Sequence, residues 1–276
     1  MIVLLWNIFF LIAEHENALL HHHAQMVRDI LRPVFDFHYR SNMLEQKNEI
    51  EKVIATKNWK SIVRSPGESP TTQAESVLPM IPDVAVHYRC GDNTVGHYGY
   101  LSYPAFKRRI PSTARTIYVM AENPSRNSNT QRNNQCNAIL TGLFDYLKAE
   151  FSQASIVILR GANMFDDMTR LALANTTICS VSSFCIWPAL SSTTKAYFPI
   201  TRLIAKATAP LYDVGKTFEW LNYFPDEVVL PGVKSKRMDN SHIVKFLNNP
   251  KGFRPLPPQY VLDKQRGRNS KRGQSP

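Results

Sequence analysis

The chain has 276 residues, of which 43% are hydrophobic and 20% charged, and it carries a formal net charge of +11. This length and composition suit one large or two modest globular cores, and they exclude a fibrous or wholly disordered protein. The charge is unevenly spread. From Gly232 to the end, eleven Lys and Arg accompany two acidic residues, so this stretch alone carries +9 and the rest of the chain only +2. The basic character therefore belongs to a C-terminal extension, residues 226–276.

The first segment, Met1–Ala13, is apolar (MIVLLWNIFFLIA) but has no basic residue before the apolar run and no clear cleavage site. It is also shorter than the roughly 20 residues that span a bilayer. A signal-anchor remnant, a buried strand and a wrongly assigned start fit it equally well.

Two helices are expected next. Apolar spacing predicts one over Asn17–Arg32, ended by Pro33, and a second over Asn42–Ala55. Residues 65–72 (SPGESPTT) have the composition of a linker. We therefore expect residues 1–75 to form a short helical N-terminal part.

After this linker, short β-branched runs alternate with helical stretches, the clearest of which is Asn134–Phe151. This alternation predicts an α/β fold with a Rossmann-type, doubly wound parallel sheet over residues 76–225. Ligands of such sheets bind at the carboxyl ends of the strands. The expected strands are Val84–Cys90, Thr116–Ala121, Ser155–Leu159, Thr177–Val181 and, more weakly, Lys195–Phe198.

The tract His87-Tyr88-Arg89-Cys90-Gly91-Asp92 ends the first of these strands. The guanidinium of Arg89 offers a planar fork of donors that suits a phosphate or diphosphate. Gly91 allows close approach of the backbone, and Asp92 can orient a donor. The alternative is an ordinary surface arginine at a turn.

A second polar segment lies between Asp166 and Pro199. Asp167 is expected at the start of a short helix, where its carboxylate could accept hydrogen bonds from a nucleobase or simply cap the helix. Ser182 and Ser183 are expected to open the next helix, whose free N–H groups suit a phosphate.

The four cysteines have no zinc-type spacing and are too few for a disulfide framework. Cys90 and Cys179 lie in apolar, strand-like runs, which favours buried free thiols. No Asp-x-Asp motif is present, and the histidines at 15 and 21–23 are interpreted as a solvated helix face. No metal is therefore expected.

The pairing of HxRxGD with a downstream D-x11-C-x-x-SSF segment resembles the fucosyltransferase superfamily, which includes the α1,2-, α1,6- and protein-O-fucosyltransferases. The stretch Thr116–Asn123 (TIYVMAEN) resembles the strand between those two motifs. The resemblance covers about Asp83 to Ile204, under half of the chain. It implies a GT-B glycosyltransferase fold, a GDP-fucose donor and localisation in the Golgi or elsewhere in the secretory pathway.

The resemblance also implies roles for individual residues. Arg89 would bind the donor diphosphate, supported by His87 and Asp92. Asp167 would contact the guanine. Ser182, Ser183 and the amide of Phe184 would hold phosphate or ribose. Transfer to a glycan or protein hydroxyl would invert the anomeric configuration without a metal or other cofactor.

The resemblance offers two candidates for the catalytic base. The α1,6-type enzymes have a carboxylate ten residues after the motif histidine, where this chain has His97; Asp92 is the alternative base. The segment before the nucleotide domain is also short for a complete first Rossmann half. Two other interpretations therefore stay open: a non-catalytic GDP-sugar-binding protein, and an interaction protein with an α/β scaffold.

The last residues, Lys264–Pro276, contain no acidic residue and almost no apolar one, which predicts a disordered basic tail. Contact with an acidic surface is an alternative to a merely solvated tail, and nucleic acid is not the expected partner.

Overall fold

The computed structural model describes residues 17–44, 79–90, 100–122, 130–160, 163–180, 182–199, 221–224, 228–229 and 240–249. Only the backbone is described for residues 17–27, 130–132, 183, 221–224 and 228–229. The apolar segment Met1–Ala13, the expected linker at 65–72 and the tail Lys264–Pro276 lie outside the described residues, as does most of the expected helix over Asn42–Ala55.

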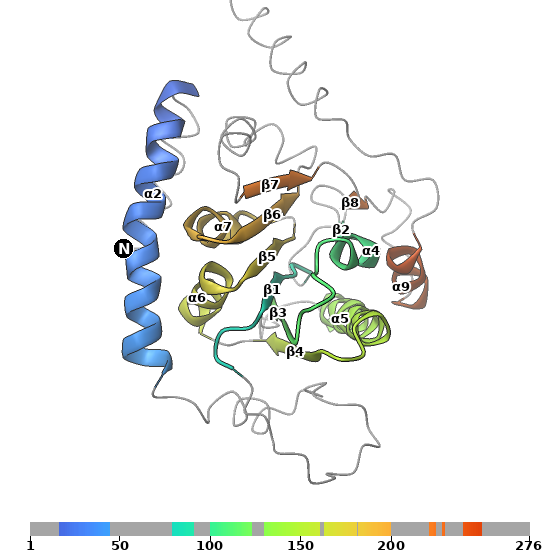
Figure 1. The fold of residues 1–276 in the computed structure, drawn as a ribbon. Helices are drawn as coiled ribbons and strands as arrows, with labels where there is room; N and C mark the ends of the chain where they lie inside the picture. The colour runs from blue at the N-terminus through green and yellow to red at the C-terminus, as the bar shows by residue number, and fades with distance from the viewer. Residues whose placement is uncertain are drawn as a thin grey trace, which may run out of the picture.

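A six-stranded sheet forms the centre of the fold, with the strand order β4-β3-β1-β5-β6-β7 (Figure 1). Every neighbouring pair in it is parallel. Numbered by their order along the chain, the six strands lie 3-2-1-4-5-6, which is the order of doubly wound dinucleotide-binding sheets. The strands are β1 (Val84–His87), β3 (Thr116–Ala121), β4 (Ser155–Arg160), β5 (Thr176–Cys179), β6 (Lys195–Pro199) and β7 (Leu221–Phe224).

Central strands are buried on both faces because helices cover the sheet on each side. All residues of β1, β3 and β5 are buried, which is why these strands read as continuous apolar runs and do not alternate with polar residues. The predicted parallel α/β sheet is thereby confirmed.

One face of the sheet carries α4 (Tyr103–Lys107) and α5 (Thr130–Glu150), with α9 (Asn240–Asn248) packed on α5. The other face carries α6 (Met164–Leu173) and α7 (Ile186–Ser191), as Figure 1 shows. A separate antiparallel pair joins β2 (Tyr100–Leu101) to β8 (Val228–Val229).

Close packing of α4, α5 and α9 explains one glycine. A Cβ at Gly142 in α5 would lie 2.7 Å from the hydroxyl oxygen of Tyr103 and 2.7 Å from Cγ1 of Val244. The Tyr103 hydroxyl donates to Ile139 O at 2.8 Å, so it cannot retreat without losing that bond. A residue without a side chain is therefore required at position 142.

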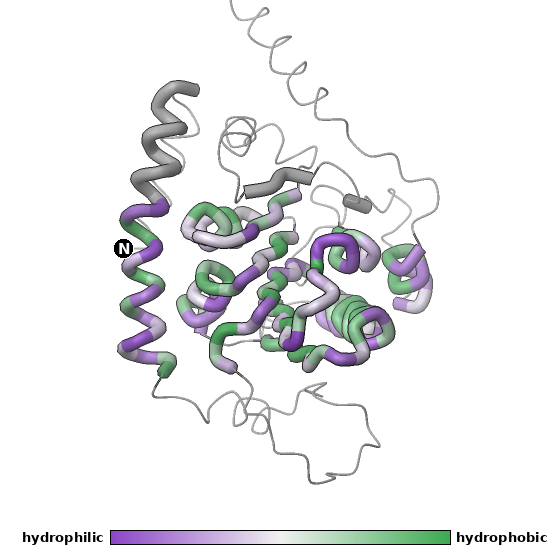
Figure 2. The backbone as a smooth tube through the Cα atoms, in the orientation of Figure 1, coloured by the Kyte–Doolittle hydropathy of each residue, from purple (hydrophilic) through white to green (hydrophobic). Residues whose placement is uncertain are grey.

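The first helix, α2 (Asn17–His38), lies outside α6 and α7 and contacts both. Hydrophilic and hydrophobic residues alternate along the coloured part of the α2 backbone, as expected for a helix with one packed face (Figure 2). Phe35 is buried and its ring lies 5.6 Å from that of Phe165 in α6. Arg32 donates to Ala172 O at 3.0 Å.

The predicted end of this helix was wrong. The helix continues through Pro33, and a π-helix, η1 (Tyr39–Met43), follows it. Pro33 is exposed, and the contacts of Phe35 and His38 with α6 hold the next turns helical. Tertiary packing thereby outweighs the missing proline N–H.

Other predicted boundaries differ at their ends. β1 stops at His87 and not at Cys90, and β5 covers Thr176–Cys179 and not Thr177–Val181. The predicted strand Thr116–Ala121 is confirmed at both ends. The short or edge elements α4, β2, β7, β8 and α9 were not predicted. None of the described helices is long and apolar enough to cross a membrane.

Candidate functional site

The candidate site lies where the direction of strand addition in the sheet reverses. From β1 the chain adds β3 and then β4 on one side, and later β5, β6 and β7 on the other. β1 and β5 are therefore neighbours, with His87 opposite Cys179 at their carboxyl ends. In open α/β sheets this switch point is where ligands bind, because the connections leave it in opposite directions.

Three hydrogen bonds join the residues that follow the two strands. Ser180 N donates to His87 O at 2.9 Å and continues the ladder. Arg89 N donates to the Ser180 hydroxyl oxygen at 2.9 Å, and that hydroxyl lies 3.3 Å from Nδ1 of His87. The Ser180 hydroxyl can donate to Nδ1 or accept from it, and the tautomer of His87 sets which of the two it does.

The second predicted segment folds against the same residues. The ring of Phe184 lies 5.0 Å from the His87 ring, at 33°. The amide of Phe184, which was expected to hold phosphate, donates to the hydroxyl oxygen of buried Ser182 at 3.3 Å. Ser183 begins the 3-10 helix η2 (Ser183–Cys185), which leads into α7.

Both strand ends are also tied covalently, which corrects the prediction of free thiols. Cys90 is bonded to Cys136 of α5, and Cys179 is bonded to Cys185. All four cysteines are therefore in disulfides. Spacing along the sequence could not indicate the first bond because its partners lie 46 residues apart and meet only when α5 packs on the sheet.

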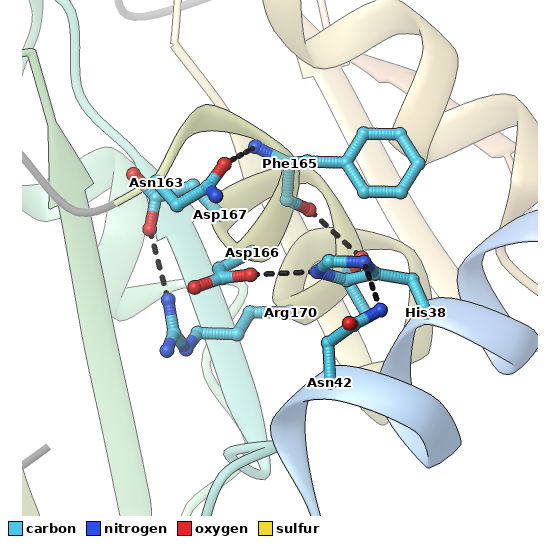
Figure 3. Close-up of polar contacts among 8 residues, drawn as sticks. His38, Asn42, Asn163, Phe165, Asp166, Asp167 and Arg170 are labelled. Atoms are coloured by element: carbon cyan, nitrogen blue, oxygen red, sulfur yellow. Dashed lines mark hydrogen bonds and ion pairs between the residues drawn. The ribbon is translucent and has the colours of Figure 1, made fainter. Parts of the chain in front are cut away.

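Asp167 lies in the first turn of α6, which starts at the same sheet edge after β4 (Figure 3). It does not cap the helix, because the N-cap is Asn163, whose side chain accepts from Phe165 N at 2.9 Å. One oxygen of the Asp167 carboxylate accepts from Arg170 at 3.1 Å. No hydrogen bond among the described residues links Asp167 to His87, Arg89 or Ser180.

Burial dominates the electrostatics of this carboxyl group. It raises the pKa of Asp167 to about 7, with Asp166 adding to the rise and Arg170 opposing it. The ion pair with Arg170 is buried too, and Nε of Arg170 is without a hydrogen-bond partner in the described structure. Asp167 can therefore change its ionisation near neutral pH.

A histidine of α2 reaches the start of α6. Nε2 of His38 lies 2.6 Å from a carboxylate oxygen of Asp166, and Nδ1 lies 3.1 Å from the amide nitrogen of Asn42 (Figure 3). An amide nitrogen can only donate, so Nδ1 accepts and Nε2–H donates to Asp166. Sequence reasoning missed this contact, because 128 residues separate the two partners.

The structure thus brings His87, Arg89, Ser182 and Phe184 together and places Asp167 at the same edge, beside Arg170. Asp92 and His97, the two candidate bases, lie outside the described residues, as does the side chain of Ser183. Sequence reasoning missed Ser180, because the predicted strand Thr177–Val181 placed it inside the strand, whereas β5 ends at Cys179 and leaves Ser180 at the carboxyl edge.

A search of family models, of curated proteins and of solved structures found no match for this chain. No group of three or more His, Cys, Asp or Glu side chains in the described part of the chain is placed to hold a metal ion.

Proposed function

We propose that this protein is a glycosyltransferase of GT-B type that binds GDP-fucose at the β1–β5 switch point and transfers fucose to a glycan or protein hydroxyl. The main support is that the two polar segments follow neighbouring strands, β1 and β5. Arg89 and Ser180, which lie 91 residues apart in the sequence, meet there. One hydroxyl, that of Ser180, is hydrogen-bonded to both His87 and Arg89. A polar group shared in this way holds the arginine backbone in a fixed place.

The proposed chemistry is a single displacement at the anomeric carbon. The acceptor hydroxyl attacks, the bond between the sugar and the diphosphate breaks, and GDP leaves with inversion. Arg89 would stabilise the negative charge that develops on the leaving diphosphate. Asp167 would accept hydrogen bonds from the guanine, and His97 or Asp92 would remove the acceptor proton.

The disulfides support the compartment expected for such an enzyme. Disulfides form and persist in secreted and secretory-pathway proteins and are rare in reducing compartments. A chain in which all four cysteines are bonded fits the secretory pathway, and localisation of the tagged protein with organelle markers would test this.

The decisive experiment measures GDP binding by isothermal calorimetry and GDP-fucose hydrolysis by release of free fucose. Wild-type protein is compared with Arg89→Ala and with Arg115→Ala, which removes an exposed arginine at the opposite edge of the sheet. We expect Arg89→Ala to weaken GDP binding by at least about tenfold, the cost of losing one charge-assisted hydrogen bond. Arg115→Ala should leave binding unchanged.

The outcomes separate the alternatives. Absence of GDP binding by wild-type protein would overturn the proposal. Binding that survives Arg89→Ala would overturn the role of that residue. GDP binding without hydrolysis, and without transfer to any of a panel of acceptors, would show that the protein is a non-catalytic GDP-sugar-binding protein and not an enzyme.

A further inference from the structure

The two disulfides sit on the two sides of the candidate site. Cys179 and Cys185 enclose the segment that contains Ser180, Ser182 and Phe184. Cys90 directly follows Arg89 and is bonded to Cys136 in α5. Each strand end is thus attached covalently at the place where it would meet a ligand.

The surroundings of the two bonds differ. Nη2 of Arg160, at the end of β4, donates to Sγ of Cys136 at 3.5 Å. The same guanidinium donates to Glu122 O at 3.1 Å and to the side chain of Asn137, and it is buried with an exposed fraction of 8%. Sγ of Cys179 lies 3.3 Å from Cys185 O, and Sγ of Cys90 likewise lies 3.9 Å from Cys136 O, so in the described part of the chain it is the guanidinium contact that distinguishes the two bonds.

A guanidinium stabilises a neighbouring thiolate, and a carbonyl oxygen does not. The more stable thiolate is the better leaving group in thiol–disulfide exchange. Burial lowers the pKa of Arg160 to about 10, and the nearby carboxylate of Glu122 opposes this shift. The same carboxylate disfavours a thiolate at Cys136, because the two groups carry like charges. Arg160 stays protonated at neutral pH, so a cation remains beside Cys136.

We propose that Cys90–Cys136 is a redox-sensitive bond that controls ligand binding, with Arg160 stabilising the departing Cys136 thiolate, and that Cys179–Cys185 is the more resistant bond. The link to ligand binding rests on the proposed function; the order in which the bonds open does not.

The exchange needs a dithiol reductant. Its thiolate attacks Sγ of Cys90, which is 3% exposed while the other three cysteines are fully buried, and Cys136 leaves as a thiolate beside Arg160. The second thiol of the reductant then attacks the mixed disulfide and loses its proton. Cys90 leaves and takes up a proton to become a thiol, and the reductant becomes a disulfide. Two electrons pass from the dithiol to the protein.

Opening this bond removes the covalent anchor that follows Arg89. On its other side, Arg89 keeps the backbone hydrogen bond to Ser180 and the continuation of β1, where Tyr88 N donates to Met120 O at 2.9 Å. One hydrogen bond is worth far less than a covalent closure. Loss of this closure removes only part of the stability of a typical domain, so the reduced protein should stay folded, but it should lose much of its hold on the diphosphate because the Arg89 backbone is held less firmly.

The test is a titration of the full chain with mixtures of reduced and oxidised dithiothreitol. At each ratio the thiols are alkylated, each disulfide is quantified by peptide mass spectrometry, and GDP binding and circular dichroism are measured. We expect Cys90–Cys136 to open at a lower proportion of reductant than Cys179–Cys185, and GDP binding to fall with the first step while the spectrum is unchanged.

Arg160 is tested with three variants. Arg160→Gln should make Cys90–Cys136 harder to open by about tenfold, the cost of losing one hydrogen bond to a charged group. Arg160→Lys keeps the cation and should restore part of the effect, which also controls for a folding defect in the glutamine variant. Arg32→Gln, which removes a guanidinium bonded to Ala172 O and Asp36, should leave the titration unchanged.

Three results would overturn the proposal: opening of both bonds together with unfolding, an unchanged titration in both Arg160 variants, or full GDP binding after Cys90–Cys136 has opened. If the oxidised protein binds no GDP at all, the proposed function fails, and the order of opening alone decides whether the bond is redox-sensitive.

Discussion

The two edges of the same sheet differ in how their polar groups are used. At the amino edge, one carboxylate oxygen of Asp83 accepts from Arg115 N at 2.8 Å, from Thr116 N at 3.0 Å and from the Thr116 hydroxyl at 3.2 Å. Asp83 O also accepts from Thr176 N at 3.0 Å. This one residue joins the starts of β1, β3 and β5.

At the carboxyl edge the polar groups come from side chains of several segments, and disulfides supply the attachment that Asp83 supplies at the other edge. Ser180 and His87 are joined there, and Asp167 lies on the helix that starts at the same edge. A carboxylate oxygen that accepts from two backbone N–H groups and one hydroxyl, as in Asp83, joins strand starts and has a structural role. A set of converging side chains on covalently anchored loops indicates binding.

The largest expected effect concerns the two disulfides. Loop closure predicts that removing Cys90–Cys136 by a double alanine substitution lowers the free energy of unfolding by about 4 kcal/mol, because its partners lie 46 residues apart. Removing Cys179–Cys185, whose partners lie 6 residues apart, should cost about 2 kcal/mol. Urea denaturation of both double variants tests this, and equal losses would contradict the loop-closure account.

The amino edge should be structural only. Asp83→Ala removes an acceptor of three hydrogen bonds and should lower the free energy of unfolding by about 2–3 kcal/mol, while the affinity for GDP stays unchanged. Asp145→Ala, at an exposed position of α5, is the control and should alter neither quantity. Weaker GDP binding by folded Asp83→Ala protein would contradict a purely structural role for the amino edge.

Asp167 gives the carboxyl edge a dependence on pH. Its pKa of about 7 means that roughly a tenth of the carboxyl groups are ionised at pH 6 and roughly nine-tenths at pH 8. If the carboxylate binds guanine, GDP affinity should rise about tenfold between these values in wild-type protein. It should be flat in Asp167→Asn, measured by calorimetry at several pH values.

The same group has an opposite effect on stability. Because the pKa in the folded state lies above that of an unfolded aspartate, folded protein holds the proton more tightly, and the free energy of unfolding falls as pH rises from about 4 to about 7. The Asp167 carboxyl group faces Arg170, and the carboxylate of its neighbour Asp166 is bonded to His38. These charged and titratable groups also affect how stability varies with pH. A stability difference between wild type and Asp167→Asn that does not vary with pH would contradict the burial of this charge.

The smallest effect is expected at Ser180. Ser180→Ala removes the hydrogen bonds to Arg89 N and to the His87 ring and should cost about 1 kcal/mol in the free energy of unfolding. GDP affinity should also fall severalfold, because the Arg89 backbone loses its anchor. Ser191→Ala, which removes a buried hydroxyl bonded to Trp187 O in α7, should cost similar stability and leave GDP affinity unchanged.

Part of the fold and of the candidate site could be predicted from the sequence. The apolar run Thr116–Ala121 predicted its strand to the residue, and the run at Val84 predicted that Arg89 would lie near a strand end, although the strand stops at His87 and not at Cys90. Local patterns sufficed there, because strands buried on both faces consist of continuous apolar residues. Short edge elements such as β7 and α4 escaped prediction, because a few residues carry too little periodicity.

Local sequence patterns were enough to predict the α/β class, the main strands and several polar residues at their ends, because these depend on neighbours along the chain. Four features became visible only in the folded protein: the strand order that joins β1 to β5, the pairing of Cys90 with Cys136, the passage of α2 through Pro33 and the contact of His38 with Asp166. Each of these depends on residues far apart in the chain, which come together only when helices pack on a completed sheet.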